Sequence, residues 1–187
     1  SLVKASPLVT VKLSTQFINS NLIGKYNYTN IAAAITIGNY FKVNNKQIQE
    51  ALEAYIPRNN RSQIIEKKNN KIILDAYNAN PSSMQVALDH FSNLKESPKT
   101  VILGDMFELG VESKKEHQAI VNLADSKLFE NTFYVGENFD KSTTKNHQFK
   151  SFEELQNYLQ KKPLINQIIL IKGSRGMKLE RVLEFID

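Results

Sequence analysis

The chain has 187 residues, of which 41% are hydrophobic and 23% charged, and its formal net charge is +5. This is an ordinary composition for a folded protein, and no apolar run approaches the roughly 20 residues of a membrane-spanning helix. Cysteine is absent, which excludes disulfides and thiolate metal sites. The chain starts without methionine and without a secretion signal. We therefore expect a cytoplasmic protein without a membrane span, and either a processed chain or a piece of a longer one.

The excess of positive charge is spread along the chain. Lysines alternate with acids, as in "EKKNNK" (66–71) and "ESKKEH" (112–117), and no basic run is interleaved with aromatic residues. This favours a solvated basic surface over nucleic-acid binding, while a site for a small phosphorylated ligand stays open. The three histidines are too scattered in the sequence to suggest a zinc motif.

The first 55 residues predict one strand and two helices. "LVTVKLST" (8–15) has the pattern of a strand, and residues 29–41 form a helix whose small, apolar side chains suggest burial. Residues 45–55 are amphipathic. The stretch "IPRNNR" (56–61) then interrupts the periodicity, and we place a domain boundary at about residue 56. Because so few strands precede it, residues 1–55 are expected to be the end of an incomplete domain.

From that boundary onward, short β-branched runs alternate with helical segments. "SQIIEKKNNKIILDAY" (62–77) predicts a hairpin that turns at Asn69 and Asn70. Further strands are expected at 100–104, 132–136 and 167–173, and helices at 84–94, 113–126, 151–160 and 179–186. The alternation predicts right-handed crossovers, and hence an α/β fold with a mostly parallel sheet, one antiparallel strand and flanking helices.

Two of these helices start with the spacing of a capping box. Ser113 precedes Glu116 by three residues, and Ser151 precedes Glu154 in the same way. In a capping box the side chain of the first residue accepts a hydrogen bond from the backbone N–H of the second, and the side chain of the second accepts one from the backbone N–H of the first. We expect both serines to cap their helices.

Three strand ends are unusually polar. They are "DAYNANPSS" (75–83), "GDMFELG" (104–110) and "KGSRG" (172–176). In open parallel sheets, ligands bind where strands end and helices begin. An acid at such an end, Asp75, can accept hydrogen bonds from ribose hydroxyls or bind a metal, but it can equally cap the turn.

The other polar residues of these loops also allow a structural interpretation. Asn78 and Asn80 suit the turn before Pro81, and that interpretation is favoured. "KGSRG" is a plausible anion site, although the G-x-x-x-x-G-K-[ST] motif occurs nowhere in the chain. His117 is more simply a surface residue than a base. Asp105 and Glu108 could orient an amine or a metal, or could merely be the acids of a turn.

Asparagines also precede the alanine-rich helix of the first part, in "LIGKYNYTNIAAA" (22–34). Asn27 and Asn30 stand at helical spacing there. A side-chain amide pairs one donor with one acceptor and can therefore recognise the edge of an adenine.

Taken in order, "GKYNYTNIAAA", "IPRNNRSQ", "ILDAYNANPSSM", "VILGDMFELG" with the histidine after it, and "LIKGSRGMKLE" resemble the Mur ligase family. These are ATP-dependent, amide-forming enzymes of peptidoglycan synthesis. The last three stretches look most like the members that add D-alanyl-D-alanine to a UDP-N-acetylmuramoyl-tripeptide.

The resemblance implies that residues 1–55 end a central ATP-binding domain and that residues 56–187 form a C-terminal Rossmann-like domain. The P-loop, the domain for the UDP-sugar and the ligands of Mg²⁺ would lie outside this sequence, so the chain alone is expected to be inactive. The reaction would transfer a phosphoryl group from ATP to the tripeptide carboxylate, and the dipeptide amine would then displace phosphate. Water must be excluded meanwhile.

The resemblance also implies residue roles. Asn27 and Asn30 would bind adenine, Arg61 the ATP phosphates and Asp75 the ribose. Arg61 and Lys172 would be catalytic, with Arg58 as an alternative to Arg61. The substrate side would be formed by Asn78, Asn80, His117, Ser174 and Arg175.

Alternatives to this function stay open. A sister ligase for another amino acid or a folylpolyglutamate synthase belongs to the same class, although "YNANP" argues against both. A non-catalytic Rossmann-like module that binds a phosphorylated ligand through "KGSRG" is a different class. We expect ATP and Mg²⁺ as cofactors, no nucleic-acid partner and a monomer.

Overall fold

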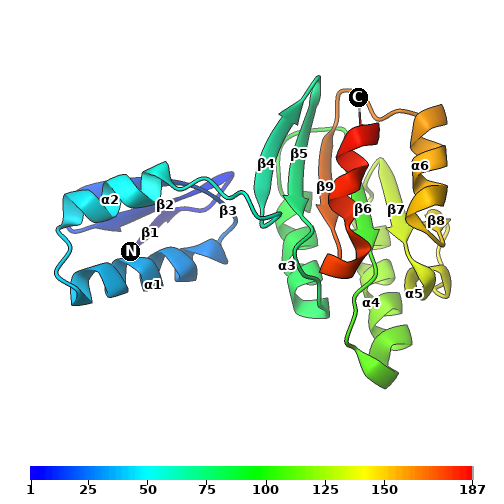
Figure 1. Ribbon diagram of the computed structural model, residues 1–187, viewed down its shortest axis with the longest axis horizontal. Helices are drawn as coiled ribbons and strands as arrows, with labels where there is room; N and C mark the ends of the chain where they lie inside the picture. Colours follow the sequence, from blue (N-terminus) through cyan, green and yellow to red (C-terminus); the bar gives the residue numbers. More distant parts are fainter. Residues whose placement is uncertain (187) are drawn as a thin grey trace. The chain divides into compact units, whose positions relative to one another are not determined.

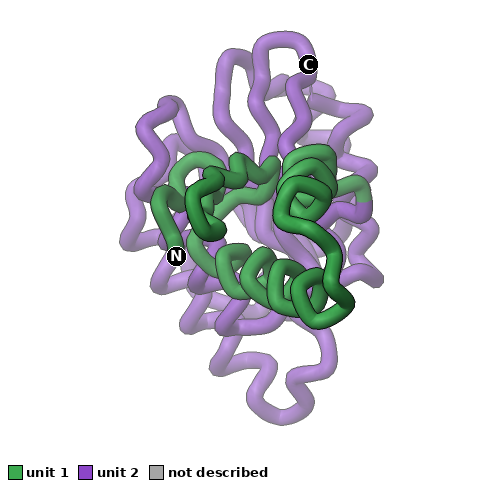
Figure 2. Tube along the Cα trace, turned by 90° about the vertical axis from the view of Figure 1, so that its left-hand side faces the viewer, with its two compact units in different colours: residues 1–58 green, residues 59–187 purple. Residues whose placement is uncertain are grey.

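The computed structural model describes residues 1–186. The chain divides into two compact units, residues 1–58 and residues 59–187 (Figure 2). The division falls within the predicted interruption at 56–61. No helix of residues 1–186 is both long and apolar enough to cross a membrane. That the first unit is the end of an ATP-binding domain stays a prediction.

The first unit is a three-stranded antiparallel sheet with two helices. Its elements are β1 (Leu2–Lys4), β2 (Leu8–Leu13), β3 (Gln16–Ile23), α1 (Asn27–Tyr40) and α2 (Asn45–Ala54). The sequence did not reveal β3, because polar residues occupy half of it and Ser20 is one of its inward positions. The Ser20 hydroxyl is satisfied there by the carbonyl of Val9, at 2.8 Å.

The burial predicted for α1 is wrong within this unit. Only Asn27 and Ile31 are buried, whereas Ile37 is 59% and Tyr40 79% exposed. The helix is apolar around its whole circumference, but β2 and α2 cover only one side of it. Composition alone therefore could not say which side of α1 would be buried.

The second unit is built on a six-stranded sheet in the order β4-β5-β9-β6-β7-β8 (Figure 1). The strands are β4 (Gln63–Lys67), β5 (Asn70–Asp75), β6 (Lys99–Gly104), β7 (Asn131–Val135), β8 (His147–Phe149) and β9 (Ile168–Lys172). Only β4 pairs antiparallel, with β5; every other pairing is parallel. The predicted mostly parallel α/β fold with one antiparallel strand is confirmed.

Helices cover both faces of this sheet. They are α3 (Pro81–Ser92), α4 (Ser113–Ser126), α5 (Glu137–Asp140) and α6 (Phe152–Lys161), with 3₁₀ segments η1 (Gly110–Glu112), η2 (Arg175–Met177) and η3 (Leu179–Phe185). Segments α6 and η3 pack together over one face, and α3, α4 and α5 follow one another over the other (Figure 1). All five residues of the central strand β9 are buried, as expected for a strand that is covered on both faces.

Some local predictions are wrong in detail. Lys67 pairs with Asn70, so the hairpin turns at Lys68 and Asn69 instead of Asn69 and Asn70. The Asn70 side chain is buried and donates to the carbonyl of Leu164 at 2.7 Å. This distant contact fixes Asn70 inside the strand. The C-terminal helix is also of the 3₁₀ type, and the short strand β8 was not expected.

Of the two serines predicted to cap helices, Ser151 caps its helix and Ser113 does not. Ser151 does cap α6 by accepting from the amide of Glu154, but the Glu154 carboxylate accepts from the Lys150 amide, one residue earlier than a capping box requires. Ser113 does not cap α4, because η1 runs directly into this helix and makes Ser113 its first residue. Its hydroxyl instead lies 3.3 Å from a ring nitrogen of His117.

Candidate ligand-binding site

The three polar loops lie at one edge of the sheet of the second unit. Asp75, at the end of β5, is paired in register with Lys172, the last residue of β9. On the other side of β9, Leu103 of β6 pairs with the same Lys172. Because these strands are parallel, the loops that follow them, 75–83, 104–110 and 172–176, converge at their carboxyl ends.

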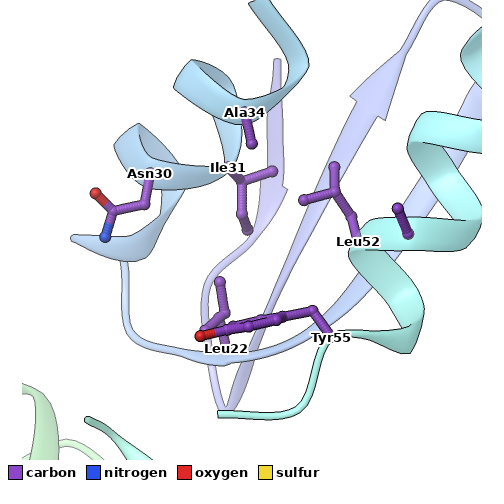
Figure 3. A pocket seen from close by; sticks show the side chains of 7 residues that line it. Leu22, Asn30, Ile31, Ala34, Leu52 and Tyr55 are labelled. Atoms are coloured by element: carbon purple, nitrogen blue, oxygen red, sulfur yellow. The ribbon is translucent and has the colours of Figure 1, made fainter. Parts of the chain in front are cut away.

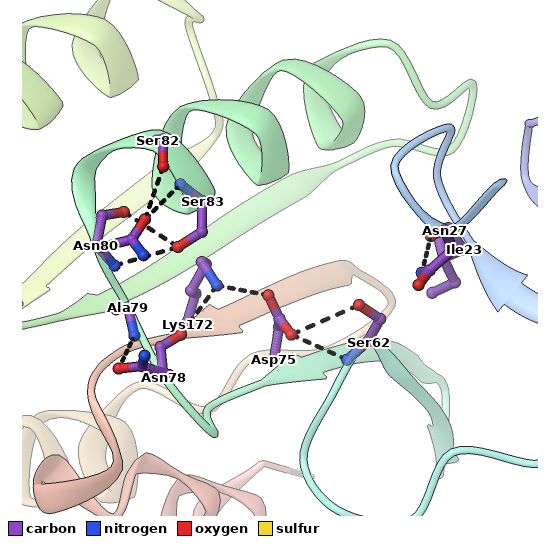
Figure 4. Close-up of polar contacts among 10 residues, drawn as sticks. All are labelled: Ile23, Asn27, Ser62, Asp75, Asn78, Ala79, Asn80, Ser82, Ser83 and Lys172. Carbon is purple, nitrogen blue, oxygen red and sulfur yellow. Dashed lines mark hydrogen bonds and ion pairs between the residues drawn. The ribbon is translucent and has the colours of Figure 1, made fainter. Parts of the chain in front are cut away.

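A buried ion pair lies at the centre of this edge. The Lys172 ammonium is 2.6 Å from the Asp75 carboxylate, and the two side chains are 3% and 19% exposed (Figure 4). The ammonium also donates to the carbonyl of Asn78 at 3.2 Å, and the amide of Ser62 donates to Asp75 at 3.0 Å. A buried charge needs such compensation. The pair thus joins β5, β9, the turn after β5 and the segment before β4.

Asp75 keeps the capacity to bind a ligand. Its two oxygens accept bonds from Lys172 and from Ser62, but an ionised carboxylate has about four acceptor positions. The carboxylate is also partly exposed. It can therefore accept a hydroxyl hydrogen while its ion pair stays intact. The ribose role of Asp75 stays a prediction.

The two asparagines of the turn differ in their local bonding (Figure 4). Asn80 is the N-cap of α3. Its side chain accepts a hydrogen bond from the Ser83 amide at 2.8 Å, and the Ser83 hydroxyl accepts one from the backbone amide of Asn80. The side chain of Asn78 accepts only from the adjacent amide of Ala79. In the described chain the NH₂ group of Asn78 has no protein partner. Asn78 is thus the better placed of the two for a ligand, whereas Asn80 has a structural task.

Ser174 connects the second and third loops. Its hydroxyl accepts from the amide of Phe107 at 2.9 Å, and its amide donates to the carbonyl of Asp105 at 3.1 Å. The residue is only 4% exposed. These contacts hold the backbone of the 172–176 loop against the 104–110 loop.

His117 is fully buried, so the interpretation of it as a surface residue is wrong. One ring nitrogen, Nε2, accepts from the amide of Met106 at 3.0 Å, and Nδ1 lies 2.7 Å from the carbonyl of Ser113, to which it therefore donates. The imidazole ring also makes a T-shaped contact with the ring of Phe139. The imidazole thus supports the 104–110 loop from behind, because α4 turns this side chain toward the sheet.

Asp105 is likewise occupied by the protein. Its carboxylate accepts from the backbone amides of Asn138 and Phe139, each at 2.9 Å, at the start of α5. Gly136 has φ of +125°, and a Cβ built there would come within 2.3 Å of that carboxylate. Within residues 1–186, no group of three or more His, Cys, Asp or Glu side chains could hold a metal ion.

An aromatic residue that the sequence did not single out joins two of the predicted cations. The guanidinium carbon of Arg61 lies 3.8 Å from the ring centre of Tyr77, and that of Arg175 lies 5.5 Å from it. The ring is 39% exposed. The sequence signal that could have identified Tyr77 is a large aromatic residue within a polar strand end, "DAYNANPSS". Arg58, the alternative to Arg61, belongs to the first unit.

In the first unit, the predicted asparagines contact each other. The NH₂ group of Asn27 donates to the carbonyl of Ile23 at 2.7 Å (Figure 4). The NH₂ group of Asn30 donates to the Asn27 side chain at 2.9 Å. Asn27 is 7% exposed, whereas Asn30 lies at the edge of an apolar cavity between α1 and α2 (Figure 3). The cavity has a volume of about 320 Å³ and is lined by Leu22, Asn30, Ile31, Ala34, Ala51, Leu52 and Tyr55.

The second unit is therefore an α/β domain with a candidate ligand-binding site, in which a partly exposed carboxylate and two exposed arginines lie at the carboxyl edge of the parallel strands. Residues 60–175 match the protein family described as Mur ligase, glutamate ligase domain. The chain belongs to this family.

Three similar curated proteins carry the name UDP-N-acetylmuramoyl-tripeptide--D-alanyl-D-alanine ligase. The protein from Rickettsia prowazekii is 34% identical over 67% of this chain, that from Buchnera aphidicola subsp. Baizongia pistaciae 33% over 90%, and that from Bacillus subtilis 30% over 87%. The matched regions are 29%, 38% and 38% of those proteins. The chain thus spans about a third of these relatives' length.

Solved structures share the fold. MurF from Acinetobacter baumannii superposes with a TM-score of 0.82 at 24% identity, over 98% of this chain and 43% of that one. MurF ligase from Thermotoga maritima, solved in complex with ADP, gives 0.77 at 20% identity, over 99% and 44%. At such identities the likeness concerns the fold.

Proposed function

We propose that this chain is part of an ATP-dependent ligase that joins D-alanyl-D-alanine to a UDP-N-acetylmuramoyl-tripeptide. The observation that carries the proposal is the single name shared by relatives from distant bacteria, matched over two thirds or more of the chain. The arrangement of the second unit supports it, because a cationic strand edge suits an anionic substrate. Because the chain matches only about a third of those proteins, the proposed activity is that of the longer protein.

The second unit has groups that fit a nucleotide triphosphate. Arg61 is exposed and forms no ion pair with any acid of the described residues, so its five N–H donors are available for phosphate oxygens. Asp75 has free acceptor positions for a ribose hydroxyl. When bound, ATP would supply the phosphoryl group that activates the tripeptide carboxylate. Arg61 would neutralise charge that develops on that group.

The first unit would hold the base. The Asn30 side chain retains its carbonyl oxygen and one N–H, which are the two groups needed to recognise an adenine edge. Asn27 would orient that amide, because its own carbonyl oxygen accepts from Asn30 while its NH₂ group is fixed on Ile23.

The substrate side follows from the loops. D-alanyl-D-alanine has an amine, a carboxylate and a peptide group, and the free amide of Asn78 can bind the dipeptide backbone. Arg175 would lie on the face where the dipeptide and the phosphoryl group meet. Asn80, Ser174 and His117 would then act by fixing the loop backbones. We also propose that Lys172 positions Asp75 and does not itself contact the reacting groups, because its ammonium is buried and already paired.

Residues 1–186 offer no cluster of ligands for Mg²⁺. We propose that the metal is bound by other parts of the longer protein. A cytoplasmic location and a monomeric state stay expectations.

The test is a ligation assay on the longer protein with ATP, UDP-N-acetylmuramoyl-tripeptide and either D-alanyl-D-alanine or single amino acids. We expect ADP release and a mass increase of the sugar peptide with the dipeptide only. Activity with a single amino acid would indicate a sister ligase. Binding of ATP without any product would favour the non-catalytic module.

A further inference from the structure

Arg61, Tyr77 and Arg175 form a cluster that separate roles for the two arginines do not explain. Three segments bring these side chains together: the stretch before β4, the turn after β5 and the loop after β9. Both guanidinium carbons lie within 5.5 Å of one ring centre. Two like charges held around one ring repel each other unless something attracts both.

The ring supplies part of that attraction. The face of an aromatic ring is electron-rich, and a guanidinium above it gains about 0.5–1 kcal/mol at an exposed site. Arg61, at 3.8 Å, is stacked on Tyr77, and Arg175 is within the same attractive range. The Tyr77 hydroxyl forms no hydrogen bond within the described chain, so the ring itself is what this residue contributes.

The backbones of all three residues are fixed by the same ion pair or by its neighbours. Ser62, next to Arg61, donates its amide to Asp75, which lies two residues before Tyr77. Asn78, next to Tyr77, accepts from Lys172. Ser174, next to Arg175, bonds to the 104–110 loop through its amide and its hydroxyl. The three side chains are exposed. The backbone next to each of them is held by these hydrogen bonds.

The two arginines also carry charge that the protein does not neutralise. Neither forms an ion pair with a carboxylate of residues 1–186, and the nearest acid along the β5 turn, Asp75, is already paired with Lys172. Two uncompensated guanidinium groups held by anchored segments provide planar donors for one oxyanion. A dianionic phosphoryl group matches their summed charge better than a single carboxylate does.

We propose that Tyr77 is the positioning residue of a two-arginine site, formed with Arg61 and Arg175, that binds a phosphoryl group. The inference deepens the proposed function, because the longer protein would use the site to hold the transferred phosphoryl group. Tyr77 acts through the two arginines and does not react. Phenylalanine can replace it, whereas an aliphatic residue of similar bulk cannot.

The first experiment needs no ligase activity. Pyrophosphate is titrated into the 187-residue chain at low ionic strength, and binding is followed by calorimetry for the parent, Tyr77→Phe, Tyr77→Leu and Arg175→Gln. We expect Tyr77→Phe to bind within about twofold of the parent, and Tyr77→Leu and Arg175→Gln to bind about fivefold to tenfold more weakly. Tyr40→Leu, which removes a 79% exposed tyrosine from α1, is the matched control and should bind like the parent.

The other outcomes contradict the proposal. Unchanged binding by Tyr77→Leu, or equal losses in both Tyr77 variants, would overturn the role of the ring. No pyrophosphate binding by the parent would overturn the site, and acetate bound as tightly as pyrophosphate would overturn the phosphoryl assignment. A thermal melt of each variant shows whether a loss of binding comes from unfolding.

A second measurement separates this inference from the proposed function. In the longer protein, Tyr77→Leu should lower kcat about tenfold or more, whereas the KM for the dipeptide should change less than about threefold; Tyr77→Phe should restore kcat. A large rise in the dipeptide KM with unchanged kcat would assign the arginines to the dipeptide carboxylate instead. If the longer protein catalyses no ligation while the chain still binds pyrophosphate through Tyr77, the function proposal fails and the site stands.

Discussion

Lys172 and Asp75 are 97 residues apart in the chain, yet they form a 2.6 Å ion pair at the ends of adjacent parallel strands. The Lys172 side chain is almost entirely shielded from water, so it has little freedom to reach a ligand. Its contacts instead fix the carboxylate of Asp75 and the carbonyl of Asn78. The pair is thus the frame of the candidate site.

Lys172→Met should strongly destabilise the chain. It keeps most of the apolar stem but leaves the Asp75 carboxylate without a counter-charge, which costs about 3 kcal/mol of unfolding free energy for a buried pair. Urea unfolding of the 187-residue chain measures this. The double variant Asp75→Asn with Lys172→Met should be more stable than Lys172→Met alone, because no charge is left unpaired. Equal stabilities would contradict the coupling of the two residues.

Asp75→Ala should raise the KM for ATP in the longer protein. A hydrogen bond from a hydroxyl to a charged acceptor contributes about 1.5–3 kcal/mol, which corresponds to about tenfold or more in binding. Steady-state kinetics at varied ATP checks this. Asp89→Ala removes another aspartate, which pairs with Lys127 outside the site, and should leave the KM unchanged. An unchanged KM for Asp75→Ala as well would contradict the ribose assignment.

Substitution of Asn80 should affect mainly the stability of the chain, whereas substitution of Asn78 should affect mainly dipeptide binding. Asn80→Ala removes an N-cap and should lower the unfolding free energy by about 1 kcal/mol. Asn78→Ala should change stability by less than half of that, since its side chain bonds only to the adjacent amide. In the longer protein, Asn78→Ala should instead raise the KM for D-alanyl-D-alanine. Thermal melts of the chain and dipeptide kinetics make the comparison, and a reversed order would contradict it.

His117→Leu should destabilise the second unit and loosen the 104–110 loop. The substitution leaves the buried amide of Met106 without an acceptor, a loss of about 1–3 kcal/mol. Hydrogen exchange at Met106 and Phe107 should become faster than in the parent. His147→Leu, which replaces an exposed histidine, is the control. Unchanged exchange would show that the imidazole does not support this loop.

His90 should make stability depend on pH. Burial lowers the pKa of His90, and its Nε2 atom is buried without a partner within residues 1–186. The unfolded chain therefore binds more protons at this position than the folded chain, between the lowered pKa and the ordinary value near 6.5. The contribution of neutral His90 to the free energy of unfolding is fully present above about pH 6.5. It is lost as the pH falls through the pKa that His90 has in the folded chain.

Urea unfolding at several pH values checks this for the parent and for His90→Gln. The variant should lose less stability than the parent between about pH 7 and pH 5, because glutamine does not titrate. Parallel curves for the two proteins would contradict the role of His90.

The architecture of the second unit was predictable because its signals are local. Apolar runs such as "TVILG" and "QIILIKG" alternate with amphipathic helices, and a chain with that alternation can bury its strands only in a parallel sheet covered on both faces. The same argument predicted that the polar stretches 75–83, 104–110 and 172–176 follow strands, where open parallel sheets bind ligands. The family resemblance rests on five motifs, three of which include these loops, and it could also be recognised from the sequence.

Other features depended on contacts between distant segments. Whether His117 is exposed follows from the side of α4 that packs on the sheet, and the place of Asn70 follows from its bond to Leu164. The strand β3 was hidden because Ser20 takes an inward position, where its hydroxyl depends on the carbonyl of Val9 in the neighbouring strand.

The sequence by itself determined the alternation of strands and helices, the family and the loops that carry polar residues, because hydrophobic periodicity and motifs are local properties. Only the tertiary structure decided how those residues divide their tasks. It paired the ammonium of Lys172 with the carboxylate of Asp75, and it brought the guanidinium groups of Arg61 and Arg175 to the ring of Tyr77. The reason is physical: burial and pairing of charges are set by neighbours that are close in space and far apart in the chain.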